Sequence, residues 1–373
     1  MENRNRRISV SEQERAQIRA AKRRKRLMIA MIERIVAALI FVVVLVIIIS
    51  ATVKSVGKSK ERKEEKEIAE QEIQNIDPLA GYTPIVSDEE LVTLTEEPTI
   101  EVKQFTATES ANPLYIPGDV ESANAILINM DTNEIIASKG GKDRIVPASM
   151  TKVLTVISAW KRITPEQLNE SVIVPQEAID YSFKHKCSCV GFEPGEIVTV
   201  RDLFYGTILP SGGDAAVALA IYIAGSQEEF VNMMNADLQE FGMGSTSHMM
   251  NMVGINDENH YSTCYDMAML LERAMDDDFL AEVLSAHIYT TSSSDEHPEG
   301  LEISNWFLRR IEDKDFGGTI WGAKTGYVDE SRSCSVSCEI SNTGVKYLCC
   351  TAGAHNSWRC INDHASIYKN LCQ

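Results

Sequence analysis

The sequence predicts an α/β (α+β) domain built on one mostly antiparallel sheet with flanking helices. Strand patterns lie at both ends of the domain and helical patterns lie between them, an order that brings the two ends together in one sheet. At the first end, residues 124–138 hold two apolar runs separated by Asp131-Thr132-Asn133, which predicts a β-hairpin. Three strands and a closing helix are expected at the other end, at 319–326, 333–340, 345–352 and 358–371.

The middle of the domain is expected to be helical. Pro147-Ala148-Ser149 precedes the run MTKVLTVISAWKRI, whose apolar residues recur at helical spacing. Four more helices are expected, at 200–207, 213–224, 227–241 and 265–275.

The net charge differs between the start of the chain and the rest. The 373 residues carry a formal net charge of −18, while residues 1–54 alone carry +8, which leaves −26 for the remainder. The acidic body has no run of Lys or Arg that could hold a phosphate backbone, so no nucleic-acid partner is expected. A basic start and an acidic body indicate two different compartments.

Residues 35–53 predict a transmembrane helix. This run of 19 residues carries no charge, and about 20 apolar residues cross a bilayer as a helix. Basic residues precede it, so residues 1–34 are expected to form a cytoplasmic tail, with the rest of the chain outside a cell membrane that it spans once. A cleaved signal peptide is the alternative, and Ser50-Ala51 offers a weak cleavage site.

Residues 54–115 predict an extracytoplasmic linker. They begin with a mixed-charge run and continue as an acidic stretch dotted with Thr and Pro, without a sustained hydrophobic period. The folded domain is therefore expected over 116–373.

The nine cysteines all follow residue 186, in the part expected outside the membrane, where disulfides can form. Their odd number and irregular spacing define no pairing. Cys187-Ser188-Cys189 and Cys349-Cys350 lack the paired spacing of a structural zinc site, and the latter two are expected in a buried strand as small apolar residues. The histidines show no ligand spacing, and His260 is expected to be structural. We therefore expect neither a metal nor another cofactor.

The first motif with chemical meaning is Ser149-Met150-Thr151-Lys152 at the start of a helix. Residues i and i+3 share a helix face, so Lys152 is expected beside Ser149. A serine hydroxyl becomes a good nucleophile when an adjacent base takes its proton. A lysine can be that base when burial or a second cation lowers its pKa.

The second motif is Ser211-Gly212-Gly213-Asp214, which precedes a helix of small residues. A hydroxyl on a glycine-rich corner is well placed to pass a proton to a leaving group. An ordinary turn with Ser211 or Asp214 as the helix cap is the alternative.

The third motif is Lys324-Thr325-Gly326, inside a predicted strand. Lys and Thr side chains on an edge strand, followed by a glycine that lets a ligand approach the backbone, suit a peptide that ends in a carboxylate. Lys324 would also be the second cation that keeps Lys152 neutral. A strand that simply ends in a turn is the alternative.

Together the three motifs occur in the order described for penicillin-binding proteins and β-lactamases. The segments PASMTK, LPSGGDAA, HYSTCYDMA and GAKTGY each resemble their counterparts in serine-type D-alanyl-D-alanine carboxypeptidases, the low-molecular-mass penicillin-binding proteins. The resemblance runs from about Asn124 to the C-terminus. It implies a β-lactamase/penicillin-binding-protein-like transpeptidase fold with a helical subdomain.

The resemblance also implies a reaction. Ser149 would be the acylated nucleophile, with Lys152 as its general base and Ser211 as the proton relay to the departing D-alanine. The substrate would be a peptidoglycan stem peptide that ends in D-Ala-D-Ala, and β-lactam antibiotics would inhibit the enzyme by trapping Ser149.

The third motif would hold the substrate. By the resemblance, Lys324 and Thr325 would bind its terminal carboxylate, with Gly326 giving access to the backbone. The N–H group of Tyr327, with that of Ser149, would form the oxyanion hole.

Position 213 departs from the family pattern. Gly213 stands where an asparagine usually contacts the lysine and the substrate, so a slower enzyme is expected, with position 213 still counted among the substrate-binding residues. Two rival functions stay open. One is a catalytically weak or inactive wall-binding scaffold with the same fold, and the other is a β-lactamase, against which the missing deacylating glutamate counts.

Overall fold

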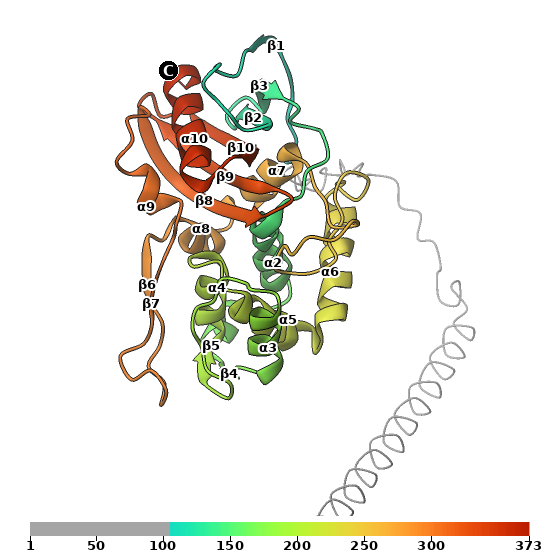
Figure 1. Ribbon diagram of the computed structural model, residues 1–373, viewed down its shortest axis with the longest axis vertical. Helices are drawn as coiled ribbons and strands as arrows, with labels where there is room; N and C mark the ends of the chain where they lie inside the picture. The colour runs from blue at the N-terminus through green and yellow to red at the C-terminus, as the bar shows by residue number, and fades with distance from the viewer. Residues whose placement is uncertain (1–104, 373) are drawn as a thin grey trace, which may run out of the picture. The chain divides into compact units, whose positions relative to one another are not determined.

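A six-stranded sheet, in the order β1-β3-β2-β10-β9-β8, forms the centre of the computed structural model, which describes residues 105–372 (Figure 1). β1 pairs with β3 in parallel, and every other neighbouring pair in this sheet is antiparallel. β2, from the start of the domain, therefore pairs with β10, from its end. The strands are β1 Thr108–Leu114, β2 Asn124–Asn129, β3 Glu134–Lys139, β8 Gly318–Val328, β9 Arg332–Ser341 and β10 Lys346–Ala354.

Helices cover both faces of the sheet and form a further layer away from it (Figure 1). α10 packs on β9 and β10 from one face, while α7 and α8 pack on the other face. α3 to α6 gather around α2 as the helical subdomain. The helices are α2 Thr151–Trp160, α3 Gln176–Lys184, α4 Val200–Ile208, α5 Gly213–Ala224, α6 Gln227–Glu240, α7 Cys264–Met275, α8 Asp278–Ser285, α9 Leu308–Ile311 and α10 Ser357–Leu371.

The sheet separates two hydrophobic cores because alternate residues of a strand point to opposite faces. In β2, Ile126 and Ile128 join the larger core, which includes α2 and α7. Ala125 and Leu127 join the smaller core under α9 and α10. All four side chains are fully buried or nearly so. The β2–β3 hairpin is thus fixed from both sides.

A small hairpin, β6 Ile288–Thr290 with β7 Glu302–Ser304, extends from the sheet region to the helical subdomain (Figure 1). Its loop is held there by the buried carboxylate of Asp202 in α4. Asp202 accepts hydrogen bonds from Tyr289 Oη at 2.8 Å and from the Ser292 N–H at 3.0 Å. The hairpin is therefore docked by specific polar contacts.

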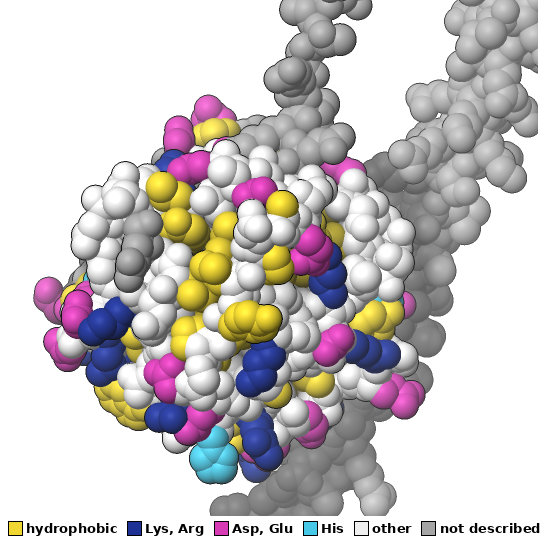
Figure 2. Space-filling view, turned by 90° about the horizontal axis from the view of Figure 1, so that it is seen from above, with side chains coloured by type: hydrophobic (Ala, Val, Ile, Leu, Met, Phe, Trp, Pro, Cys, Tyr) yellow, Lys and Arg dark blue, Asp and Glu magenta, His cyan; other side chains and the backbone are white. Residues whose placement is uncertain are grey.

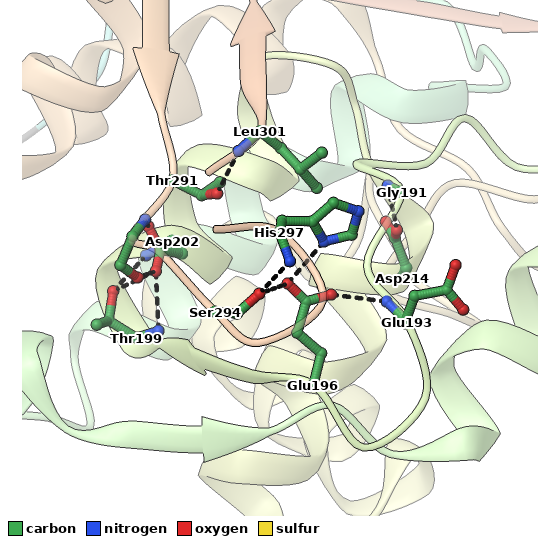
Figure 3. Close-up of polar contacts among 11 residues, drawn as sticks. Gly191, Glu193, Glu196, Thr199, Asp202, Asp214, Thr291, Ser294, His297 and Leu301 are labelled. Carbon is green, nitrogen blue, oxygen red and sulfur yellow. Dashed lines mark hydrogen bonds and ion pairs between the residues drawn. The ribbon is translucent and has the colours of Figure 1, made fainter. Parts of the chain in front are cut away.

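A second buried acid, Glu196, holds the tip of the same loop (Figure 3). Glu196 accepts a hydrogen bond from Ser294 Oγ at 2.7 Å, and its carboxylate lies 2.9 Å from His297 Nδ1. It precedes β5 Ile197–Thr199, which pairs with β4 Ser171–Ile173. The loop thus rests on the edge of the helical subdomain.

Most predicted elements are confirmed. The hairpin at 124–138, the four helices between 200 and 275, the three strands after 318 and the closing helix all occur, with ends shifted by at most two residues. The folded part, however, begins before residue 116. Phe105 and Ala107 are buried, and β1 extends the sheet.

The predicted cytoplasmic tail, the transmembrane segment at 35–53 and most of the predicted linker lie outside the described residues. Within residues 105–372, no helix combines the length and hydrophobicity needed to span a bilayer. The face seen from above mixes basic and acidic side chains around a band of hydrophobic ones (Figure 2). Neither sign of charge dominates that face.

Candidate active site

The turn that carries Ser149 is a strained bend held by close backbone packing. Ala148 has a φ of 45°, which is rare for a residue with a Cβ. A Cβ on Gly254 would lie 1.9 Å from Ala148 O, and a Cβ on Gly326 would lie 3.0 Å from Ser149 N. Two glycines therefore let neighbouring segments close around this turn, which fixes the position of Ser149.

Lys152 lies one helical turn after Ser149, and its amine contacts the serine. Lys152 Nζ donates to Ser149 Oγ over 3.1 Å and to Val253 O over 2.7 Å. The lysine is only 1% exposed, and burial is the main cause that lowers its pKa to about 8. An amine with such a pKa is far better suited than an ordinary lysine to take a proton near neutral pH.

The carbonyl that holds Lys152 belongs to a loop organised by Asn251. Asn251 Oδ1 accepts hydrogen bonds from the N–H groups of Val253, Gly254 and Ile255, at 3.2, 2.7 and 2.9 Å. One amide side chain thus shapes the loop that packs on the Ser149 turn. No motif in the sequence indicated this loop.

Ser211 and Lys324 form a second serine–lysine pair. Lys324 Nζ donates to Ser211 Oγ and to Thr325 O, both over 2.9 Å. Lys324 is 2% exposed, and burial, followed by the charge of Lys152, lowers its pKa well below the ordinary value. Lys152 therefore disfavours the charged form of Lys324, whereas Lys324 is not among the causes that shift the pKa of Lys152.

Ser149, Lys152 and Ser211 line one cleft of about 540 Å³. Lys324 and Gly213 are buried and do not line this cleft in the described part of the chain. The other six residues predicted from the sequence do line it: Ser149, Lys152, Ser211, Thr325, Gly326 and Tyr327. Segments that lie far apart in the sequence thus come together at one site.

Gly213 has no room for a side chain because Cys187 occupies the space. A Cβ on Gly213 would lie 2.6 Å from Cys187 Cβ and 3.1 Å from Cys187 Sγ. Cys187 comes from the loop after α3 and lines the cleft. Burial raises the pKa of its thiol, which keeps the thiol neutral beside Lys152. Position 213 therefore offers no side chain, and a cysteine from another segment stands in that place.

Asp214 anchors the loop that carries Cys187, and Figure 3 shows its contact with Gly191 of that loop. The Asp214 carboxylate is 1% exposed and accepts hydrogen bonds from the N–H groups of Val190 and Gly191, all at 3.0 Å. Asp214 thus ties the second motif to this loop, a role that neither reading of the sequence anticipated.

Several other residues that line the cleft were not indicated by the sequence. They come from loops and from the one-turn helix α9, which are too short or too irregular to show a hydrophobic period. They include Cys187, Val253, Trp306, Arg310 and His355.

The lesser candidates lie away from the cleft. His260 is fully buried, lies 2.9 Å from Thr151 Oγ1, and has its pKa lowered to about 4 by burial. Cys349 and Cys350 are buried in β10 as predicted, and all nine cysteines are free thiols. Residues 105–372 contain no group of His, Cys, Asp or Glu side chains that could hold a metal ion.

The sequence profile of the peptidase S11 family, described as D-alanyl-D-alanine carboxypeptidase, matches residues 106–351. The chain belongs to this family. The matched residues contain all three motifs, so membership in the D-alanyl-D-alanine carboxypeptidase family explains their order.

Curated relatives carry the same family name. D-alanyl-D-alanine carboxypeptidase DacF of Bacillus subtilis is 34% identical over 218 residues, which cover 57% of this chain and 53% of DacF. DacC of Escherichia coli is 32% identical over 155 residues, which cover 40% of this chain and 38% of DacC. The match thus spans about half or less of the length of these relatives.

Solved structures confirm the expected fold. The Streptomyces K15 DD-transpeptidase is similar with a TM-score of 0.59 at 23% identity, over 69% of this chain and 97% of that chain. A D-alanyl-D-alanine carboxypeptidase from Mycobacterium tuberculosis is similar with a TM-score of 0.58 at 25% identity, over 70% and 94% of the two chains. The chain therefore has the penicillin-binding-protein type of fold, a sheet with flanking helices and a helical subdomain.

Proposed function

We propose that this chain is a serine-type D-Ala-D-Ala carboxypeptidase that removes the terminal D-alanine from peptidoglycan stem peptides, and that β-lactams acylate it. One observation carries the proposal: Lys152 Nζ lies 3.1 Å from Ser149 Oγ, in a cleft that is also lined by Ser211, to which the buried Lys324 donates a hydrogen bond. Family membership supports this choice of substrate.

Acylation begins when Ser149 Oγ attacks the carbonyl between the two D-alanines. The hydroxyl proton passes to Lys152 Nζ as the C–O bond forms. The N–H groups of Ser149 and Tyr327 stabilise the oxyanion. When the C–N bond breaks, Lys152 gives this proton through Ser211 Oγ to the nitrogen of the departing D-alanine and is neutral again for the next step. Lys324 Nζ donates to Ser211 Oγ and so orients this hydroxyl.

Deacylation repeats these steps with water. Water attacks the ester carbonyl on Ser149 and gives a proton to Lys152. The ester bond then breaks, Ser149 recovers its proton, and the shortened peptide leaves with a new carboxylate. The strained turn around Ala148 holds the serine in place for both steps.

The proposal also includes where the protein lies in the cell. The uncharged run at 35–53, preceded by basic residues, supports a single-pass anchor in the cell membrane with the catalytic domain outside. An impermeant fluorescent penicillin should therefore label the full-length chain on intact cells. Labelling only after lysis would contradict this location.

The deciding experiment incubates the full-length protein with a penicillin and locates the modified residue by mass spectrometry. A parallel assay measures D-alanine released from a peptide that ends in D-Ala-D-Ala. Ser149→Ala should abolish both signals, whereas Ser171→Ala, at an exposed position on β4, should leave both unchanged.

Each rival function predicts another result. Rapid penicillin turnover without a lasting adduct would identify a β-lactamase. A folded protein that gives neither an adduct nor D-alanine would be a wall-binding scaffold, and the proposed function would fail.

A further inference from the structure

Cys187 and Cys189 are the two cysteines that the fold leaves accessible. The other seven thiols are buried, whereas Cys187 is partly exposed and lines the cleft, and Cys189 is exposed. The two lie on one loop, separated only by Ser188, and Cys189 Sγ donates to Cys187 O over 3.5 Å. A thiol-directed oxidant that reaches the protein therefore meets these two side chains together.

The loop that carries both cysteines is tied to the second motif. Ser188 O accepts a hydrogen bond from the Gly213 N–H at 2.7 Å. After the cysteines, the N–H groups of Val190 and Gly191 donate to the Asp214 carboxylate, as Figure 3 shows for Gly191. The residue between the two cysteines is thus the one whose carbonyl holds Gly213.

Ser211, two residues before Gly213, depends on contacts of this kind. Its φ is 64°, a strained value for a residue with a Cβ, and such a conformation persists only where the surrounding structure holds it. The Gly212 N–H donates to Gly206 O at 2.9 Å, and the Gly213 N–H donates to Ser188 O. If the Ser188 carbonyl turned away, this corner would lose one of the contacts that hold Ser211 in the cleft.

We propose that Cys187 and Cys189 form a reversible disulfide that turns the Ser188 carbonyl away from Gly213 and slows the acylation of Ser149. The disulfide is a property of the loop itself, whereas its effect on acylation rests on the proposed function.

The disulfide forms a small ring that contains Ser188. Its geometry needs the two Cβ atoms about 3.5–4.5 Å apart, whereas residues two positions apart in an extended segment lie ~6.6 Å from one another. The ring therefore bends the backbone at Ser188 and redirects its carbonyl. It also draws Cys187 Sγ out of the space beside Gly213, where this sulfur lies 3.1 Å from the position of a Cβ. A strained ring of this kind is readily reduced, so the change is reversible.

The bond forms by exchange with a low-molecular-mass disulfide. The thiolate of Cys189, the more exposed residue, attacks one sulfur of that reagent and displaces a first thiol. The Cys187 thiolate then attacks Cys189 Sγ and displaces a second thiol, so that two electrons and two protons pass from the pair to the reagent. Burial raises the pKa of the Cys187 thiol, and burial followed by the charge of Asp214 raises that of Cys189 to about 11. The exchange is therefore slow at neutral pH and faster at higher pH.

The test treats the full-length protein with oxidised glutathione and then reduces half of the sample with dithiothreitol. Mass spectrometry should find Cys187 and Cys189 linked within one peptide. Penicillin should acylate the oxidised protein about 10- to 100-fold more slowly, the scale of loss that a small displacement of a catalytic group causes. Dithiothreitol should restore the rate. Amide exchange at Gly213 should be faster in the oxidised form, because its N–H has lost Ser188 O.

Cys189→Ser is the matched control, because it leaves Cys187 in the cleft and prevents the bridge. This variant should be acylated at the wild-type rate with and without oxidised glutathione. If it slows on oxidation as the wild type does, another thiol or a glutathione adduct causes the effect, and the inference is overturned. A linked pair with unchanged acylation overturns it as well, and so does a glutathione adduct that never resolves into the linked pair.

The two proposals fail in different ways. A reduced wild type that forms no penicillin adduct sinks the proposed function and, with it, the effect on acylation. Linked cysteines with faster exchange at Gly213 would still establish the disulfide in that case. A reduced wild type that forms the adduct, together with cysteines that stay unlinked after oxidation, sinks this inference alone.

Discussion

Cys187 lies where a side chain on Gly213 would have to go, since a Cβ at position 213 would approach Cys187 Cβ to 2.6 Å. Gly213→Asn should therefore strain the second motif, cost about 1–3 kcal/mol of stability and slow acylation of Ser149 by penicillin. Adding Cys187→Gly should recover part of both losses. Thermal unfolding and acylation rates measure the effects.

Cys189→Gly serves as the control for this pair. Cys189 lies two residues away and is exposed, so its removal should not rescue Gly213→Asn. A Gly213→Asn protein with unchanged unfolding temperature would show that the loop moves aside freely, contrary to this explanation of the glycine.

The acylation rate should follow the protonation of Lys152. Burial lowers the pKa of this lysine to about 8, and only the neutral amine accepts the proton of Ser149. The neutral fraction rises as pH passes through the pKa, so the rate should rise about tenfold per pH unit below pH 8 and level off above it. Stopped-flow measurement with a chromogenic β-lactam gives the profile.

Lys152→Ala should reduce the acylation rate by about 10²–10⁴-fold and remove this pH dependence. A variant that retains the wild-type profile would show that another group acts as the base.

The buried carboxyl of Glu339 should make stability depend on pH. Glu339 in β9 is 0% exposed, and burial raises its pKa to about 7. Well below pH 4.5 both the folded and the unfolded chain hold the proton. Between pH 4.5 and 7 only the unfolded chain releases the proton, so the free energy of unfolding falls over this range. Above pH 7 the folded chain must also ionise Glu339, and the loss of stability stays at its full value.

Glu339→Gln should therefore unfold at a temperature several degrees higher than the wild type at pH 8, because it avoids a cost on the order of 3 kcal/mol. The difference should vanish at about pH 3.5, below the ordinary pKa of a glutamate. Scanning calorimetry at both pH values tests this, with the exposed Glu330→Gln as control. A Gln variant that is less stable at pH 8 would mean that the charged carboxylate has a stabilising partner.

Asp202 should control the docking of the β6–β7 hairpin. Its carboxylate accepts hydrogen bonds from Tyr289 Oη and the Ser292 N–H, and it also caps α4 through Thr199. Asp202→Ala should cost about 2–4 kcal/mol and speed hydrogen exchange across residues 288–304. Asp295→Ala, exposed on the same loop, should leave both quantities unchanged. Unaltered exchange in Asp202→Ala would mean that packing alone holds the hairpin.

The motifs predicted those contacts of the site that follow from the spacing of residues within one helix. Ser149 and Lys152 meet because i and i+3 share a helix face. The contact between Ser211 and Lys324, by contrast, joins residues 113 positions apart, and only the resemblance to a known family indicated it. Arg310, Cys187 and Val253 come from segments without periodicity, so no pattern pointed to them.

β1 and α3, which the sequence analysis did not predict, have weak hydrophobic patterns because they bury few side chains. β1 leaves six of its seven side chains exposed, so it lacks the alternation that marks a strand with one buried face. α3 buries only Ala178 and Ser182, too few apolar positions for a helical period. Gly213 was interpreted as a lost side chain, although the reason for the glycine lies in a neighbour 26 positions earlier, Cys187.

The strand order has a consequence for biosynthesis. β2 emerges early, yet one of its two neighbours is β10, and the Ser149 turn packs against Gly326 of β8. During synthesis, the turn that carries Ser149, the proposed nucleophile, therefore cannot pack fully until β8 to β10 have been made. A reagent that acylates Ser149 would accordingly report finished folding of the entire domain, and nascent or truncated molecules would stay unmarked.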